Sequence, residues 1–378
     1  MVLLSGPNLC GNENKYVKDC IDTGWVSSVG SYVTRFENQI KEFCNSKHAI
    51  ATSSGTTALH VSLILSDVQK NDYVIVPNLT FVASLNSIKY TGADPILVDV
   101  CPDSWQMDLN LLESFLKNYT YNKNGVCHLK KNDRKIKVIM PVHVFGNMCD
   151  MDKLFEISSK YNLSIVEDST EALGSTYKKK FSGTFGKFGC FSFNGNKLIT
   201  TGGGGMIVTD DDKMAFLAKH ITTQAKSDSF EYYHDMIGYN YRLTNVSSAI
   251  GVAQMENIDK FLKRKDEINN YYRENLSKIS GKIIFQEIHS NVKSNFWLFT
   301  IRSKKQKEIL NILNENAFQS RPLWVPMNKL PMFSKDIFVT NSSVTDNLYE
   351  ECLSIPCSTD IINKDLDNII SLISKVYS

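Results

Sequence analysis

The sequence lacks the paired cysteines of metal and redox motifs. Its nine cysteines are scattered, and no two form a Cys-x-x-Cys pair, so a zinc or thioredoxin-like site has little support and no metal is expected. An excess of charge of one sign is also missing. The net charge is +2 at pH 7, which gives no indication of binding to nucleic acid or to an anionic membrane surface.

Long apolar runs are absent as well. No segment has about 18 consecutive apolar residues, so no transmembrane helix is predicted, and the start of the chain lacks the basic region of a signal peptide. These absences favour a cytoplasmic protein with reduced thiols. With 378 residues, of which 42% are hydrophobic, the chain is long enough for one large domain and a smaller one.

Short apolar runs alternate with helical patterns over residues 49–210. The predicted strands are 49–51, 73–76, 96–98, 136–140, 164–166, 190–193 and 206–208. The helix candidates between them are 57–66, 83–90, 109–117 and 151–161. Most of the runs are apolar on both faces, as buried parallel strands are. The alternation therefore predicts an α/β fold with a mainly parallel seven-stranded sheet.

The C-terminal part has a different pattern. Residues 245–272 have the apolar periodicity of one long helix, with Asn245 as its N-cap. Beyond it, the strand and helix candidates are 283–285, 296–301, 305–315 and 365–377. We therefore predict a large domain over residues 1–255 and a smaller α+β domain over residues 256–378.

Three features of the predicted sheet could hold pyridoxal phosphate. Lys197 lies between a strand and the Gly202–Gly205 turn, an apolar setting that favours a neutral amine able to form a Schiff base. Asp168 ends a buried strand, where an unpaired carboxylate is costly and a pyridinium would be a partner. The Ser53–Thr57 turn opens a helix, whose free N–H groups suit a phosphate.

Turns after the predicted strands could share one crevice, because ligands bind beyond the carboxyl ends of parallel strands. These turns are 53–57, 77–81, 141–146 and 168–171. Each residue also has an ordinary structural explanation. The first turn could be a simple N-cap, Asp168 could cap the next helix, and the lysine could be solvated. Phe81 could stack on a flat ring or belong to the core, and Arg242 and Arg321 could bind anions or lie on the surface.

Motifs spread over nearly the whole chain follow the order of a known family. They are Gly11-Asn12-Glu13, Gly24 to Ser28, Ser54-Gly55-Thr56, Pro141 to Gly146, Glu167-Asp168, Ser192 to Lys197, Gly238 to Arg242 and Arg321 to Trp324. In this order they resemble the DegT/DnrJ/EryC1/StrS family of nucleotide-sugar aminotransferases. The resemblance implies the aspartate aminotransferase (fold type I) fold, with pyridoxal 5'-phosphate as cofactor.

The resemblance also implies roles around the cofactor ring. Lys197 is the Schiff-base lysine and carries protons during the reaction. Asp168 pairs with the pyridine nitrogen, and Phe81 stacks on the ring. Glu171 departs from the family pattern, because many members have Gln or His at this position, near the phenolic oxygen of the cofactor.

The remaining implied contacts concern the phosphate and the substrate. Thr56, Thr57 and Ser192 bind the phosphate. Asn240 reaches the phosphate in the site of the neighbouring subunit, so a homodimer with shared active sites is implied. The matching motifs also supply the candidates for substrate binding, which are His143, Arg242, Arg321 and Trp324.

The implied activity is transfer of an amino group from glutamate to C4 of a nucleotide-linked 4-keto-6-deoxy sugar, for surface glycan or nonulosonic acid biosynthesis. The Gly11–Glu13 and Glu167–Glu171 runs resemble the branch that leads to bacillosamine or legionaminic acid. The expected acceptor is therefore a UDP-2-acetamido-4-keto-2,6-dideoxyhexose, and a GDP-perosamine-type aminotransferase is the alternative.

Two further alternatives share the same fold. A sugar dehydratase is disfavoured because those relatives carry His where this chain has Lys197. A non-catalytic sugar-binding protein is disfavoured because Lys197, Asp168 and Phe81 are all intact.

Overall fold

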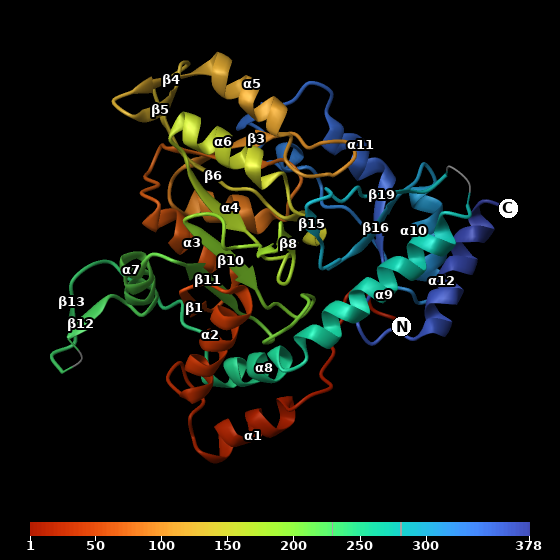
Figure 1. The fold of residues 1–378 in the computed structure, drawn as a ribbon, viewed down its shortest axis with the longest axis horizontal. Coiled ribbons are helices and arrows are strands. Elements are labelled where there is room, and N and C mark those ends of the chain that lie inside the picture. The colour runs from red at the N-terminus through yellow and green to blue at the C-terminus, as the bar shows by residue number, and fades with distance from the viewer. Residues whose placement is uncertain (229, 280–281) are drawn as a thin grey trace.

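A computed structural model describes residues 1–228, 230–279 and 282–378 of the chain (Figure 1). The seven predicted strands are present as β1 (His48–Thr52), β2 (Tyr73–Pro77), β3 (Asp94–Val98), β6 (Lys135–Ile139), β7 (Ser164–Asp168), β10 (Phe188–Ser192) and β11 (Gly205–Thr209). They belong to one sheet with the order β1-β11-β10-β7-β6-β2-β3. All pairs from β10 to β3 are parallel, and only β11 runs antiparallel to its neighbours. The predicted α/β fold is confirmed.

The sheet is larger than predicted, with ten strands among the described residues. A hairpin of β4 (Thr120–Lys123) and β5 (Val126–Leu129) extends it beside β6. Strand β18 (Ile337–Val339) pairs in parallel with β3 at the end of the main path. These three strands are short, so they give only a weak periodic pattern in the sequence.

Helices cover both faces of the sheet (Figure 1). Their bounds are α1 (Glu13–Asp22), α2 (Ser31–Cys44), α3 (Gly55–Leu65), α4 (Val82–Tyr90), α5 (Leu109–Tyr119), α6 (Met151–Tyr161) and α7 (Asp212–Thr222). Successive residues of β2 point to opposite faces. Val74 packs in the core cluster that contains α3, α4 and α7, whereas Ile75 packs in the cluster that contains α5 and α6. The sheet is thus buried on both sides, as its continuous apolar runs predict.

The single helix predicted over residues 245–272 is two helices, α8 (Asn245–Met255) and α9 (Ile258–Leu276). The break lies at Asn257. Its side-chain Nδ2 donates to the carbonyl oxygen of Ala253 at 3.2 Å, the acceptor that the Asn257 N–H would use in a continuous helix. The apolar periodicity continues across the break and therefore does not reveal it.

Asn245 does not cap its own helix, contrary to the prediction. The N-cap of α8 is Thr244, whose side chain accepts a hydrogen bond from the Ser247 N–H. Asn245 instead caps α2, because its Oδ1 accepts from the Tyr32 N–H at 3.1 Å. Its Nδ2 donates to the Trp25 carbonyl at 2.7 Å, so it joins the segment before α2 to α8.

The C-terminal part contains a second, antiparallel sheet with the order β14 (Ile284–Phe285), β16 (Phe299–Arg302), β19 (Cys352–Ile355) and β17 (Arg321–Pro322). Apolar residues of α9, α10 (Gln306–Glu315) and α12 (Asn363–Val376) pack with it in a separate core. The predicted boundary near residue 255 lies at the end of α8. The boundary stays a prediction, because β18 comes after residue 255 in the chain and yet pairs with β3 of the large sheet.

The remaining elements are short. They are β8 (Thr176–Tyr177), β9 (Lys180–Phe181), β12 (Lys226–Asp228), β13 (Tyr233–His234), β15 (Val292–Lys293), α11 (Val344–Glu351) and the two 3-10 helices η1 (Val144–Gly146) and η2 (Met327–Lys329). No helix in the described part of the chain is both long and apolar enough to span a bilayer.

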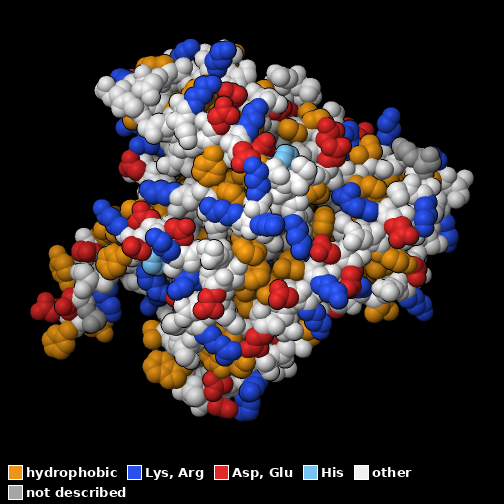
Figure 2. Space-filling view, viewed as in Figure 1, with side chains coloured by type: hydrophobic (Ala, Val, Ile, Leu, Met, Phe, Trp, Pro, Cys, Tyr) orange, Lys and Arg blue, Asp and Glu red, His pale blue; other side chains and the backbone are white. Residues whose placement is uncertain are grey.

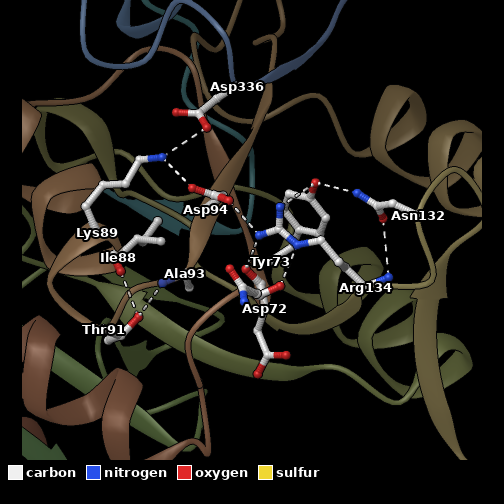
Figure 3. A network of polar contacts seen from close by, with 11 residues as sticks. Asp72, Tyr73, Ile88, Lys89, Thr91, Ala93, Asp94, Asn132, Arg134 and Asp336 are labelled. Atoms are coloured by element: carbon white, nitrogen blue, oxygen red, sulfur yellow. Dashed lines mark hydrogen bonds and ion pairs between the residues drawn. The ribbon is translucent and has the colours of Figure 1, made fainter.

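A polar network ties the amino ends of the central strands together (Figure 3). Arg134 lies 3.9 Å from the centroid of the Tyr73 ring and 2.6 Å from the Asp94 carboxylate. Lys89 bonds the other oxygen of Asp94 at 2.6 Å and reaches Asp336 at 3.0 Å. The network therefore fixes β2, β3 and the segment before β18 at their amino ends. Ligands of such sheets bind at the opposite edge, beyond the carboxyl ends of the strands.

Candidate active site

A cavity of about 310 Å³ lies at the carboxyl ends of the central strands. Its walls include residues that follow β1, β2, β7 and β10, together with Trp297 and Trp324 from the C-terminal part. Three of the four turns expected to share a crevice line it. The fourth, 141–146, lies behind the wall. It reaches the site through the Phe145 N–H, which bonds Glu171, and through the Phe145 ring, which stacks on Trp324 with centroids 5.3 Å apart.

Lys197 lies in this cavity, in the turn that follows β10. Its Nζ is 3.8 Å from Glu171 Oε1 and 3.9 Å from the centroid of the Trp297 ring. Burial lowers the pKa of Lys197, while the negative charges of Glu171 and Asp168 oppose the shift. The lowered pKa favours the neutral amine, which is the form that attacks a carbonyl carbon.

Glu171 is buried beside this lysine. Its Oε2 accepts a hydrogen bond of 2.8 Å from the Phe145 N–H, and Phe145 holds a left-handed backbone with φ of 60°. Burial raises the pKa of Glu171 to about 7, against the lowering effects of Lys197 and of the Phe145 N–H. The raised pKa of Glu171 and the lowered pKa of Lys197 bring the two neighbouring groups closer together in acidity, which favours proton exchange between them.

The raised pKa of Glu171 predicts a pH-dependent stability. Because the pKa is about 7 in the folded chain and 4.5 when unperturbed, the folded state binds the proton more tightly, and stability is lost as the pH rises from 4.5 to 7. Glu171→Gln removes this titration. In denaturant unfolding without cofactor, the stability of Glu171→Gln relative to wild type should increase by about 3 kcal/mol between about pH 4 and pH 8.

An exposed carboxyl on α9 provides the control for this experiment. Glu274→Gln should leave the pH dependence of unfolding as it is in the wild type, because Glu274 is exposed. A constant stability difference between Glu171→Gln and wild type over the same pH range would contradict the assignment.

Asp168 is the last residue of β7 and is 2% exposed. Ser84 Oγ donates to its Oδ2 at 2.6 Å, and the Thr170 N–H donates to its Oδ1 at 3.2 Å. Ser84 is itself held by Thr80 Oγ1 at 2.8 Å. Within the described ranges, no lysine or arginine nitrogen lies within 4 Å of this carboxylate. The two hydrogen bonds orient the carboxylate, and no side-chain cation of the described residues pairs with it. It can therefore stabilise a cationic ring nitrogen.

The amino terminus of α3 forms another side of the cavity. Ser54 caps the helix by accepting from the Thr57 N–H at 3.1 Å. The first intrahelical bond runs from the Ala58 N–H to the Ser54 carbonyl, so the N–H groups of Gly55 and Thr56 have no acceptor within the helix. Thr56 and Ser192 line the cavity as expected. The Thr57 hydroxyl faces away and donates to the Ser54 carbonyl at 2.8 Å.

Glycine at position 205 allows the close approach of β11 to this turn. A Cβ at Gly205 would lie 2.3 Å from the Ser54 carbonyl oxygen, a distance that only glycine avoids. The glycine-rich turn thus places the start of α3 against the sheet, beside the cavity.

The predicted aromatic and substrate-binding residues lie at different depths. Phe81 and Trp324 line the cavity, with ring centroids 6.2 Å apart, and Phe81 is 51% exposed. Arg321 lies on exposed β17, outside the lining. His143 is fully buried and bonds Glu167 Oε2 at 3.0 Å through Nε2. It does not line the cavity, so the geometry gives no support to a direct substrate contact.

Asn240 and Arg242 also lie outside this cavity. Arg242 Nη2 donates to Asn240 Oδ1 at 3.2 Å, and Asn240 is exposed. The cavity within one chain is therefore built without the residue that was expected to come from a neighbouring subunit.

Sequence reasoning missed three residues that shape the site. Thr80 and Ser84 hold Asp168, and their i, i+4 spacing just beyond β2 was an available signal. Trp297 lies against Lys197, and its Nε1 donates to the Asn196 carbonyl, 101 residues earlier in the chain, at 2.7 Å. No local pattern marks Trp297.

The donor set of the cavity fits pyridoxal 5'-phosphate. The uncapped N–H groups at the start of α3 suit its phosphate. The unneutralised Asp168 suits its ring nitrogen, and the amine of Lys197 suits its carbonyl carbon. The carboxylate of Asp168 is buried and, in the part of the chain that the structure describes, has no cationic side chain beside it. A structural role alone does not explain this arrangement, whereas a cationic ring nitrogen would.

Comparisons with known proteins agree with this chemistry. A GDP-perosamine synthase from Caulobacter vibrioides is 35% identical, over 99% of this chain and 98% of the relative. A GDP-perosamine synthase from Escherichia coli O157:H7 is 37% identical, over 98% and 97%. The structure also matches Spr1654 from Streptococcus pneumoniae, solved in a PLP form, with a TM-score of 0.87, 26% identity and 99% coverage of both chains.

The model of one family matches residues 7–374, nearly the whole chain. The protein therefore belongs to the DegT/DnrJ/EryC1/StrS aminotransferase family and is a transaminase that uses pyridoxal 5'-phosphate.

Proposed function

We propose that the protein moves the amino group of glutamate to C4 of a nucleotide-linked 4-keto-6-deoxy sugar, and that GDP-4-keto-6-deoxymannose is the acceptor. The observation that carries the transfer step is the placement of Lys197 and Glu171 beside Asp168 in one buried cavity. The choice of acceptor is supported by similarity over nearly the full length to two GDP-perosamine synthases.

In this proposal each residue has a separate task. When bound, pyridoxal phosphate supplies a carbon that takes up the amino group and a protonated ring that withdraws electrons from it. Asp168 holds the ring proton, and Thr56 and Ser192 hold the phosphate. Lys197 accepts a proton at Nζ from the donor amino acid and later delivers one to C4 of the sugar. Glutamate leaves as 2-oxoglutarate.

Two glutamates of the motifs that suggested a UDP-linked acceptor, Glu13 and Glu167, have structural roles here. Glu13 accepts from the Gly11 N–H at 2.8 Å and from Gln254 Nε2 at 2.6 Å. Glu167 accepts the N–H groups of residues 183, 185 and 186 at 2.6 to 2.9 Å. Both side chains are buried and hold the chain in place, so they give no reason to expect a contact with a 2-acetamido group.

The acceptor is tested with enzyme loaded with pyridoxamine phosphate and a panel of nucleotide-linked 4-keto sugars. Loss of the pyridoxamine absorbance reports transfer. We expect kcat/KM for GDP-4-keto-6-deoxymannose to exceed that for UDP-2-acetamido-4-keto-2,6-dideoxyhexose by about tenfold or more, since a polar mismatch in a sugar site has at least this effect. A higher kcat/KM for the UDP sugar would replace the proposed acceptor and leave the aminotransferase activity standing.

We also propose a homodimer that shares its active sites. The hairpin of β12 and β13 stands away from the body (Figure 1) and carries apolar side chains toward its tip (Figure 2). Among these side chains, Phe230 is 92% exposed and Tyr232 is 71% exposed. Exposed aromatic residues of this kind favour a protein partner, and Asn240 follows the same hairpin. Light scattering should give twice the chain mass of 42.8 kDa; a monomer would overturn the proposal.

A further inference from the structure

A lysine outside the cavity is buried without a carboxylate partner. Lys265 of α9 is 2% exposed, and within the described ranges no acidic oxygen lies within 4 Å of its Nζ. Its Nζ donates to the carbonyl oxygens of Trp297 at 2.8 Å and Cys357 at 2.6 Å, and contacts Cys357 Sγ at 3.5 Å. All three donors of the ammonium are thus used. Because burying a lysine is costly, this arrangement calls for an explanation.

Lys265 holds the main chain of Cys357 and that of Trp297, and Trp297 is the residue against which Lys197 packs. Trp297 is fixed at two further points. Its N–H donates to Asn295 Oδ1 at 2.9 Å, and its Nε1 donates to the Asn196 carbonyl at 2.7 Å. Asn295 also donates to the Glu171 carbonyl at 3.0 Å. The main chain of Trp297 is therefore held by Lys265 and Asn295, and its indole is held by the Asn196 carbonyl. Two of these three contacts lead to residues beside Lys197.

The indole face lies where it affects the charge of Lys197. An aromatic face within about 6 Å of an ammonium stabilises the positive charge, and the Trp297 ring is 3.9 Å from Lys197 Nζ. This attraction acts in the same direction as the negative charges of Glu171 and Asp168. A small rotation of the indole would weaken it.

We propose that Lys265 is a positioning residue for the transaminase reaction, holding the main chain of Trp297 so that the indole face stays against Lys197. Lys265 acts from the long helix that joins the two core regions of the molecule (Figure 1). The inference rests on the transaminase activity and not on the proposed acceptor, so it holds whichever sugar is used.

The test is Lys265→Met, which keeps the length of the side chain and removes the ammonium. The readout is the pH titration of the visible absorbance of the enzyme loaded with pyridoxal phosphate, because it follows the charge at Lys197 Nζ and needs no sugar. We expect the midpoint to fall by about half a pH unit to one unit, the size of a lost cation–π contact. With saturating substrates, kcat should fall about tenfold while KM stays within about twofold, because Lys265 does not reach the cavity.

Tyr272→Phe is the matched control. Tyr272 is fully buried on the same helix, and its hydroxyl donates at 2.7 Å to the carbonyl of Pro356, the neighbour of Cys357. This variant loses a buried bond to the same segment without touching Trp297. It should leave the absorbance midpoint unchanged, and an equal shift in Tyr272→Phe and Lys265→Met would overturn the proposal.

A double-mutant cycle tests whether the effect passes through Trp297. In a Trp297→Leu background, Lys265→Met should cause no further shift, because residues that act through one contact are not additive. Additive shifts would overturn the proposal. Lys265→Gln, which keeps a neutral donor, should lie between wild type and Lys265→Met, and it replaces Lys265→Met if that variant does not fold. Failure of both variants to fold would make Lys265 a folding residue and equally reject the positioning role.

Discussion

Lys197→Ala should abolish turnover, with a loss of about 10⁴-fold or more in kcat, because in the proposed reaction one amine serves both as the nucleophile toward the cofactor and as the proton carrier. Its Nζ is the only lysine or arginine nitrogen within 4 Å of Glu171 in the described part of the chain, so no neighbouring ammonium replaces it. The measurement is the rate of 2-oxoglutarate formation from glutamate.

The same variant separates binding from chemistry. Asp168, Thr56 and Ser192 remain in place, so Lys197→Ala should still bind pyridoxal phosphate, in a form that dialysis removes. Lys213→Ala, at an exposed position of α7, is the control and should keep wild-type activity. If Lys197→Ala retains wild-type turnover, the assignment of the catalytic lysine is wrong.

Asp168→Asn should lower kcat by about 10²-fold or more, the scale seen when a preorganised electrostatic group is removed. The shape is kept, because Ser84 Oγ can accept from the new amide instead of donating to a carboxylate. What is lost is the negative charge that, in the proposed reaction, keeps the cofactor ring nitrogen protonated. The absorbance of the bound cofactor and the steady-state rate should both change.

Ser84→Ala provides the contrast for this charge. It removes the 2.6 Å hydrogen bond to Asp168 and leaves the carboxylate charged, so its effect should be about tenfold or less. An Asp168→Asn enzyme with wild-type kcat and an unchanged spectrum would refute the pairing with the ring nitrogen. Equal losses in the two variants would indicate that orientation, and not charge, is what the ring requires.

The sequence was sufficient to predict the seven central strands of the sheet and two residues, Asp168 and Lys197, that the structure brings to one cavity. The seven predicted strands are mostly apolar runs. Asp168 ends one of them and Lys197 lies in the turn after another, so local pattern and position in the fold agree. His143 could not be placed in this way. Its pairing with buried Glu167 depends on how two strand ends meet, and a polar residue after a strand looks the same whether it faces the cavity or the core.

The errors have a common physical origin in contacts between distant parts of the chain. Asn257 interrupts a helix by a side-chain bond that apolar periodicity does not register. Asn245 caps a helix more than 200 residues earlier, with |i−j| of 213. Trp297 reaches Lys197 from the C-terminal part. In each case the residue type is compatible with several environments, and tertiary packing selects one.

The pairing of β18 with β3 has a consequence for the order in which the protein is made. In register, Phe338 lies beside Leu97, so β3 gains this neighbour only after the long stretch of chain between the two residues has been made. Until then its backbone N–H and C=O groups form an open strand edge, the kind of surface through which nascent chains pair with one another. β18 therefore covers the edge of β3 late in synthesis and, among the described residues, leaves only its own edge, three residues long, at this end of the sheet.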